Sequence, residues 1–246
     1  YPGLYTLVAD YFEPEMRSKV NGLLQLSQPI GYLLGMVLAL MVAPGLGWRN
    51  VFFITGGLGI LLAVLIFFGV KDRPRGKSEP EYADVEEITQ HKFSWSQAKD
   101  VLRIRTMWFV MLQGFAGVFP WNVITYFFFD YLAKERGYDE GSVLFTMAPV
   151  VLILASGYFV GGALGDRVFR STRKGRVIVS TVGVLLGALF LLLAMKTPVD
   201  ARGMFLLWMS LTALVMPFAA PNVVSTVYDV TVPEVRSTAQ AVKAFI

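Results

Sequence analysis

Six long runs of this sequence carry almost no charge, and they constrain its fold more than any other feature. The runs are residues 20–49, 50–70, 106–129, 141–165, 177–195 and 203–228, and Arg49 is the one charged residue within them. A helix needs about 20 apolar residues to cross a bilayer, so each run predicts a spanning helix. With 55% hydrophobic and 16% charged residues, a water-soluble globule would lack the polar residues to cover its surface. The sequence therefore predicts an all-α integral membrane protein with several spans.

Both ends of the sequence resemble parts of further spans. Residues 1–9 read as the end of one helix and residues 237–246 as the first turns of another, so we expect a fragment, incomplete at both ends. Cysteine is absent and His91 is the only histidine, which excludes disulfides and thiol chemistry and leaves no expected metal site. The sequence has no nucleotide-binding or hydrolase motif and no acid, base or nucleophile at mid-membrane depth. We therefore expect neither a cofactor nor an enzyme.

The basic residues are distributed unevenly between alternate loops. Of the 22 Lys and Arg residues, 17 fall on one side, in loops at residues 17–19, 71–105, 167–176 and 236–243. Because basic residues are retained in the cytoplasm, this side is predicted to be cytoplasmic. The net charge of +4 then reflects topology and contact with the headgroups of the lipid bilayer, and a nucleic-acid partner is not expected.

The longest polar interval, residues 71–105, predicts a cytoplasmic linker. Its first part is rich in Pro, Gly and mixed charges, as extended tethers are. Its second part can form a short helix that presents Trp95, Ala98, Val101 and Leu102 on one face, a pattern suited to the headgroup boundary. A solvated linker without such a role is the alternative.

Two loops of the sequence repeat each other. Residues 10–18 recur as residues 229–237, with Asp, Pro, Glu, Arg and Ser at the same five of nine positions. Both copies fall on the predicted cytoplasmic side, just before a helix, and they lie on opposite sides of the linker. The chain is therefore predicted to consist of two related halves, as in transporters built from parallel repeats.

A second motif, together with this repeat, resembles the major facilitator superfamily. Gly162-Ala-Leu-Gly-Asp166-Arg167, followed by the basic run 173–176, is similar to the loop signature of that family after its eighth helix. The resemblance implies two six-helix bundles related by a parallel repeat, of which this chain holds the end of helix 4 through the start of helix 11. It divides the chain into residues 1–70, the linker 71–105 and residues 106–246. It also implies secondary active transport by alternating access, in the plasma or inner membrane of a cell.

The charged residues of these motifs are candidates for a cytoplasmic gate. They are Glu15, Arg17, Asp166, Arg167, Glu234 and Arg236. A carboxylate docked on the free N–H groups of a helix start forms contacts that break when the helices separate. The resemblance implies that Asp166 meets the helix beginning at Ser18, with Glu15 and Arg17 completing the network. The alternative is that these residues only satisfy helix ends and enforce topology.

Polar side chains inside the predicted spans are candidates for a solute cavity. They recur at helical spacing on three spans, and the candidates are Gln25, Gln28, Gln113, Trp121, Asn122, Tyr126, Asn222 and Ser225. Asn122 and Asn222, near prolines, are expected to face one aqueous space. A polar group within a membrane is costly and often functional, but hydrogen bonds between helices are the alternative.

Other spans are predicted to serve packing and lipid contact. The pairs Gly31/Gly35, Gly157/Gly161 and Gly183/Gly187 are spaced for close helix packing. Residues 51–70 and 177–195 hold few hydrogen-bonding side chains in their central turns, so we expect them to face lipid.

The expected partner is a small organic solute. Aromatic residues between 109 and 129, with amides in place of charges, favour an uncharged or amphiphilic solute, as in spinster-like or sugar-type carriers of the superfamily. No titratable residue lies in the middle of a complete span, so the spans assign no coupling ion. A membrane receptor or scaffold that keeps the fold without transport is the alternative function.

Overall fold

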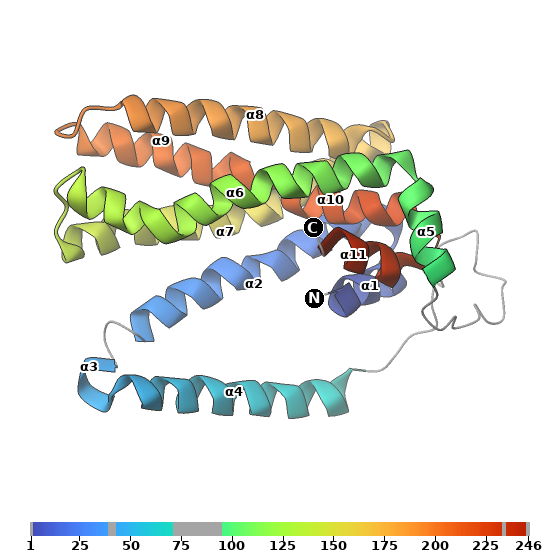
Figure 1. Ribbon diagram of the computed structural model, residues 1–246, viewed down its shortest axis with the longest axis horizontal. Helices are drawn as coiled ribbons and strands as arrows, with labels where there is room; N and C mark the ends of the chain where they lie inside the picture. The colour runs from blue at the N-terminus through green and yellow to red at the C-terminus, as the bar shows by residue number, and fades with distance from the viewer. Residues whose placement is uncertain (1, 39–42, 71–94, 233–234, 245–246) are drawn as a thin grey trace.

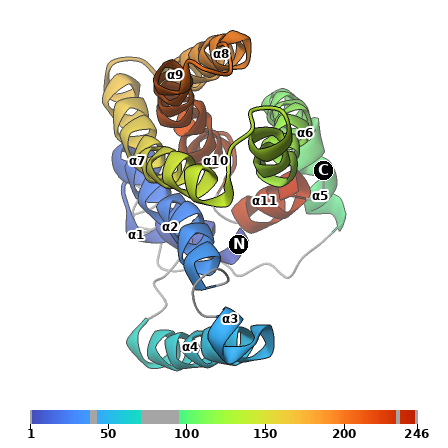
Figure 2. The same ribbon diagram turned by 90° about the vertical axis from the view of Figure 1, so that its left-hand side faces the viewer.

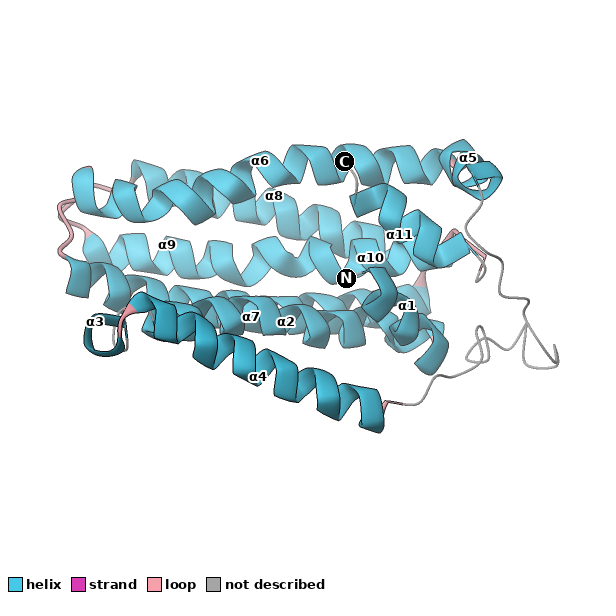
Figure 3. Ribbon diagram, turned by 60° about the horizontal axis from the view of Figure 1, so that its bottom comes forward, coloured by secondary structure: helices cyan, strands magenta, loops and turns pink. Residues whose placement is uncertain are grey.

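The computed structural model describes residues 2–38, 43–70, 95–232 and 235–244, and within these ranges the chain is helical with no strand (Figures 1 and 3). In chain order the helices are α1 (Pro2–Tyr11), η1 (Pro14–Met16), α2 (Arg17–Val37), α3 (Ala43–Leu46), α4 (Trp48–Gly69), α5 (Trp95–Arg103), α6 (Arg105–Lys134), α7 (Glu140–Ser171), α8 (Gly175–Lys196), α9 (Arg202–Val215), η4 (Met216–Phe218), α10 (Ala219–Asp229) and α11 (Arg236–Ala244). Four segments of the described chain are long and apolar enough to cross a membrane: Trp48–Gly69, Gly141–Ser171, Gly175–Lys196 and Arg202–Asp229. The all-α membrane fold expected from the sequence is confirmed.

Two of the predicted runs are divided in the structure. The run 20–49 ends its first helix by Leu38, and α4 begins at Trp48 after Gly47, whose φ of 81° requires glycine. The run 203–228 is interrupted by η4 around Pro217, because proline lacks the N–H that would continue the α-helical bonding. Asp166 does not end its helix, as the sequence suggested, since α7 continues to Ser171.

Helices α6 to α9 share one apolar core. It includes Phe128 and Leu132 of α6, Met147 of α7, Ala194 of α8 and Phe205 of α9. Seen end-on, α6 to α10 form one group, α2 lies beside α7, and α4 stands apart (Figure 2). The apolar core therefore packs helices from residue 105 to residue 215 together.

Glycines allow the closest helix contacts, as predicted for two of the three pairs. A Cβ at Gly161 or Gly183 would lie 2.5 Å or 2.7 Å from atoms of Phe218, and one at Gly157 would lie 2.3 Å from a carbonyl oxygen of α9. Gly31 and Gly35 have no described atom within 4 Å of that position, so the described helices provide no packing partner for this pair.

Two further predictions concern the outside of the bundle. No residue of α4 is buried, and α8 buries only the side that faces the other helices, so both expose apolar side chains suited to lipid. The predicted linker helix is present as α5, but Val101 is 1% exposed and packs with Met107, Val227 and Ala239. This part of the predicted lipid-facing stripe therefore contacts the second half of the chain, and the side chains of Trp95 and Ala98 lie outside the described residues.

Candidate functional site

Asp166 of α7 caps the start of α2. Its side chain is buried, and its two oxygens accept hydrogen bonds from the backbone N–H groups of Ser18 at 3.2 Å and Lys19 at 2.7 Å. The first N–H groups of a helix have no partner within that helix, and α2 has no side-chain cap from its own preceding residue. A carboxylate at this end also interacts favourably with the helix dipole. The expected contact of Asp166 with the helix beginning near Ser18 is present.

Arg176 of α8 joins this contact to two other elements. Its guanidinium donates to Asp166 Oδ1 from Nε at 3.3 Å and from Nη2 at 2.8 Å. It also donates to the Asp229 carboxylate at the end of α10 and to the backbone carbonyl of Pro14 in η1. The side chain is only 1% exposed. We call Asp166, Arg176, Asp229 and their contacts with Pro14 and Ser18 the Asp166 cluster.

Sequence reasoning missed the role of Arg176. The basic run that follows Asp166 contains it, but nothing in the run distinguishes it from its neighbours. In the structure the end of α7 and the turn after it bring Gly175 against the backbone of Val168 and Phe169, and the guanidinium lies 3.9 Å from the Phe169 ring centroid. A Cβ at Gly175 would lie 2.4 Å from that backbone, so the close turn that directs Arg176 toward Asp166 depends on a contact that only the structure shows.

The other gate candidates have different partners. The ion pair to Asp166 comes from Arg176 and not from Arg17, whose buried guanidinium donates to Ala9 O at 3.0 Å and Phe12 O at 3.3 Å. Glu15 faces Arg170 at 3.6 Å, with both side chains 59% exposed, so this pair contributes little. Arg236 donates to Tyr228 O at 3.4 Å and Arg167 is exposed, whereas Glu234 lies outside the described residues.

Three of the cavity candidates, Gln25, Asn222 and Ser225, are buried within the helix bundle. Asn21 of α2 donates from Nδ2 to Ser225 Oγ of α10 at 3.0 Å, and both are fully buried. Asn222 donates from Nδ2 to Gly161 O and Phe218 O, each at 2.8 Å, and is also fully buried. Gln25, one turn after Asn21, is 9% exposed. For Asn222 and Ser225 this conformation therefore favours the hydrogen-bonding alternative over an aqueous surface.

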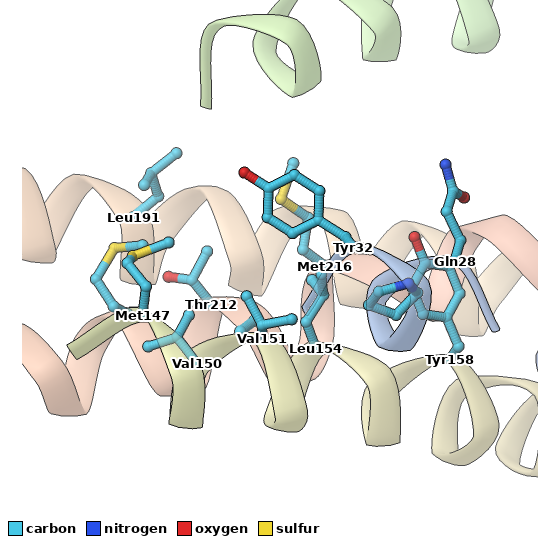
Figure 4. A pocket seen from close by; sticks show the side chains of 13 residues that line it. Gln28, Tyr32, Met147, Val150, Val151, Leu154, Tyr158, Leu191, Thr212 and Met216 are labelled. Atoms are coloured by element: carbon cyan, nitrogen blue, oxygen red, sulfur yellow. The ribbon is translucent and has the colours of Figure 1, made fainter. Parts of the chain in front are cut away.

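A cavity of about 160 Å³ lies further along α2 (Figure 4). Its lining is mostly apolar and comes from Gln28, Pro29 and Tyr32 of α2, Met147, Val150, Val151, Leu154 and Tyr158 of α7, Leu191 of α8, Met209, Thr212 and Ala213 of α9, and Met216 of η4. Gln28 is the predicted cavity residue found in this lining. Gln113 is exposed elsewhere on α6, and the side chains of Trp121, Asn122 and Tyr126 lie outside the described residues.

The cavity begins where α2 and α7 separate. Near the Asp166 cluster the two helices touch through glycines: a Cβ at Gly22 would lie 2.4 Å from Tyr158 O, and one at Gly162 would lie 2.2 Å from Ser18 O. Beyond that crossing α2 runs at an angle to α7 toward α3 (Figure 1), and Gly31 and Gly35 meet no described atom. One end of this helix pair is therefore closed by charge and close packing, and the other holds a cavity.

Comparison with known proteins identifies the family. The model of the Major Facilitator Superfamily matches residues 1–246. The chain belongs to this superfamily. It is 27% identical over 194 residues to the hexuronate transporter of Bacillus subtilis, covering 75% of this chain and 43% of that protein. It is 30% identical over 173 residues to a probable sulfoacetate transporter of Cupriavidus necator, covering 66% of this chain and 39% of the relative.

A third relative matches nearly the whole of this chain. Protein spinster homolog 1 of Xenopus laevis is 24% identical over 260 residues, covering 98% of this chain and 48% of the relative. The chain thus spans less than half the length of each of these relatives. Membership of this superfamily, with the transporter names of the two bacterial relatives, indicates a multi-pass membrane protein of a transporter family.

Proposed function

We propose that the protein is a secondary active transporter that moves a small organic solute across the plasma or inner membrane by alternating access. The arrangement that carries the proposal is a helix pair closed at one end by the Asp166 cluster and holding a cavity beyond the crossing. The closed end is the one with the excess of Lys and Arg, so we assign it to the cytoplasm. On this proposal the cavity opens to the opposite side of the membrane.

The two halves of the chain would meet and separate at the Asp166 cluster. Asp166 and Arg176 belong to the second half, and their partners Ser18, Lys19 and Pro14 belong to the first. Opening the cytoplasmic end would remove these bonds together. Because the bonds would exist in the closed conformation and not in the open one, they would bias the equilibrium between the two. Arg176 therefore joins Asp166 and the other charges predicted from the sequence as a candidate gate residue.

The solute class follows from the relatives and the cavity. The names of the two bacterial relatives refer to hexuronate and sulfoacetate, which are small organic acids, and we propose a small organic acid as the first class to test. The cavity favours a second class, an amphiphilic solute, because its lining is apolar with few polar groups such as Gln28, Tyr32 and Thr212.

Substitution of Asp166 tests the proposed gate. Asp166→Asn keeps the shape but removes the charge, and a hydrogen bond to a charged group is worth about 1.5–3 kcal/mol. Losing that much would shift the ratio of closed to open forms roughly 10- to 150-fold. We expect slower turnover, greater accessibility of the cytoplasmic end to water-soluble reagents, and unchanged affinity for solute at the cavity.

The assay is uptake of labelled hexuronate, sulfoacetate or a fluorescent lysolipid by vesicles that contain the full-length protein. Asp100→Asn is the matched control, because Asp100 is 64% exposed and, among the described residues, forms an ion pair with Arg103 on its own helix. Absence of flux for all three probes would favour the receptor or scaffold. Full activity of Asp166→Asn, with unchanged accessibility of the cytoplasmic end to reagents, would contradict the gate and would leave the motif only a role in membrane topology.

A further inference from the structure

The cavity beside α2 has a polar end and an apolar end (Figure 4). Gln28 of α2 and Tyr158 of α7 lie at the end near the Gly22 crossing. Met147 of α7 and Leu191 of α8 lie at the other end. A rise of about 1.5 Å per residue separates Tyr158 and Met147 by about 16 Å along α7. The two ends of one solute can therefore lie in different surroundings.

The other polar residues of the lining do not make its apolar end polar. Thr212 lies near Met147, but its hydroxyl donates to Trp208 O of its own helix at 2.8 Å. A hydroxyl has a single hydrogen, so Thr212 has none left to donate to a solute. Tyr32 lies between the two ends and is 44% exposed.

The described lining holds no charged side chain. A carboxylate that enters such a site loses its hydration and gains no cation in exchange, which is costly. A neutral hydroxyl, amide or ester loses less, and the Gln28 amide and the Tyr158 hydroxyl can supply its hydrogen bonds. An apolar body gains free energy by leaving water for the Met, Val and Leu side chains of the other end.

We infer that the cavity binds a neutral amphiphile, with its polar group at Gln28 and Tyr158 on the cytoplasmic side and its apolar body toward Met147. This inference rests on the proposed function and commits it to one class of solute and one orientation. For this cavity it places the amphiphile ahead of the small organic acids. The polar group would face the Asp166 cluster, so it would be the first part of the solute to leave when the cytoplasmic end opens.

The first test measures equilibrium binding of radiolabelled monodecanoylglycerol to the full-length protein in nanodiscs, with empty nanodiscs as the blank. The competitors are decanoate, which carries the same chain on a carboxylate, and glycerol, which is the polar group alone. Gln28→Leu and Tyr158→Phe remove the two polar groups. Thr212→Val is the matched control in the same lining, because it keeps the shape of the side chain and removes a hydroxyl that is already bonded.

We expect Gln28→Leu and Tyr158→Phe each to weaken binding about 2- to 12-fold, which is the effect of losing one neutral hydrogen bond. Thr212→Val should leave binding unchanged. Decanoate should compete at least about 10-fold less well than unlabelled monodecanoylglycerol, and glycerol should not compete. Equal losses in all three variants, or decanoate that competes as well as the ester, would overturn the inference.

A second test locates the two ends of the solute in the parent protein and needs no variant. A diazirine at the end of the chain should label α7 near Met147 and α8 near Leu191, whereas a diazirine on the glycerol should label α2 near Gln28. The reverse pattern would overturn the orientation. Uptake of hexuronate without any binding of monodecanoylglycerol would overturn the inference and leave the proposed function standing. Oriented binding without flux of any solute would count against the proposed function alone.

Discussion

Gly22 offers the sharpest test of how the cytoplasmic end closes. A Cβ built there would lie 2.4 Å from Tyr158 O, 3.0 Å from Tyr158 C and 3.2 Å from the Cα of Phe159, and all three are backbone atoms of α7. Non-bonded heavy atoms attract best at about 3.5–4.0 Å, so Gly22→Ala requires α2 and α7 to part by about 1 Å. No rotation of a side chain can relieve this overlap.

The cost of that separation falls on the closed form. Overpacking of a tight contact typically costs about 1–3 kcal/mol. Since 1.4 kcal/mol is a factor of ten, Gly22→Ala should shift the closed-to-open ratio by roughly 5- to 150-fold. The matched control is Gly31→Ala on the same helix, which has no described atom within 4 Å of the new Cβ. It should leave the ratio unchanged.

Distances between spin labels measure the ratio directly. Cysteines at Met16 and Arg173 place labels on exposed positions of η1 and of the turn between α7 and α8. Gly22→Ala should enlarge the population with the longer distance and slow uptake, while Gly31→Ala should do neither. Identical distance distributions for both variants and the parent would refute the reasoning that the Gly22 contact belongs to the closed form.

Two further predictions concern the other end of the bundle. Asp139 caps α7 by accepting from the Ser142 N–H at 2.6 Å, and this hydrogen bonding lowers the pKa of its carboxyl below the ordinary value. Because the pKa of Asp139 is lower in the folded state than in the unfolded state, its carboxylate stabilises the fold fully above the unfolded pKa, and this stabilisation is lost as pH falls through the folded pKa. The unfolding temperature should therefore fall less between pH 7 and 3 in Asp139→Asn than in the parent protein. An unchanged pH profile would contradict this. Arg136 is buried and donates to Thr197 O, so Arg136→Met should lower the free energy of unfolding by about 1.5–3 kcal/mol. Lys134→Met removes only an exposed pair and should change the free energy of unfolding little, and equal unfolding midpoints for the two variants would be evidence against a structural role for Arg136.

The positions of the spanning helices could be predicted from the sequence, whereas the positions of the breaks within them could not. Runs without charge locate spanning helices because burying a charge in lipid is costly, and this argument needs no partner helix. The local breaks that the structure describes are Gly47, with its positive φ between α3 and α4, and Pro217 in η4. Both residues are visible in the sequence, but only the structure shows which glycine or proline interrupts a helix and which, like Pro29 or Pro149, lies inside one.

The partners within the site were harder to predict, because they depend on which helix faces which. The docking of Asp166 on the start of α2 came from the resemblance to a family, whereas its pairing with Arg176 depends on the course of the turn after α7. A polar residue such as Asn222 looks the same in the sequence whether its side chain faces an aqueous cavity or hydrogen-bonds to a neighbouring helix, so the sequence could not distinguish the two. Gly22, which makes one of the closest contacts, does not belong to any of the glycine pairs identified by spacing, since its partner is the backbone of another helix.

The position of the Gly22 crossing along α2 sets a mechanical ratio. At 1.5 Å per residue, Ser18 lies about 6 Å from Gly22 toward the Asp166 cluster, and Tyr32 lies about 15 Å away in the other direction, at the cavity. If α2 tilts about this crossing as a rod, a movement of the Tyr32 end is about 2.5 times the opposite movement of the Ser18 end. Drawing α2 inward by about 2.5 Å over a bound solute would then lift Ser18 by about 1 Å and Lys19, which is nearer the crossing, by about 0.75 Å. The Ser18–Asp166 hydrogen bond, which is 3.2 Å long in the structure, would exceed hydrogen-bonding range, and on the proposed function this would link occupation of the cavity to release of the opposite end.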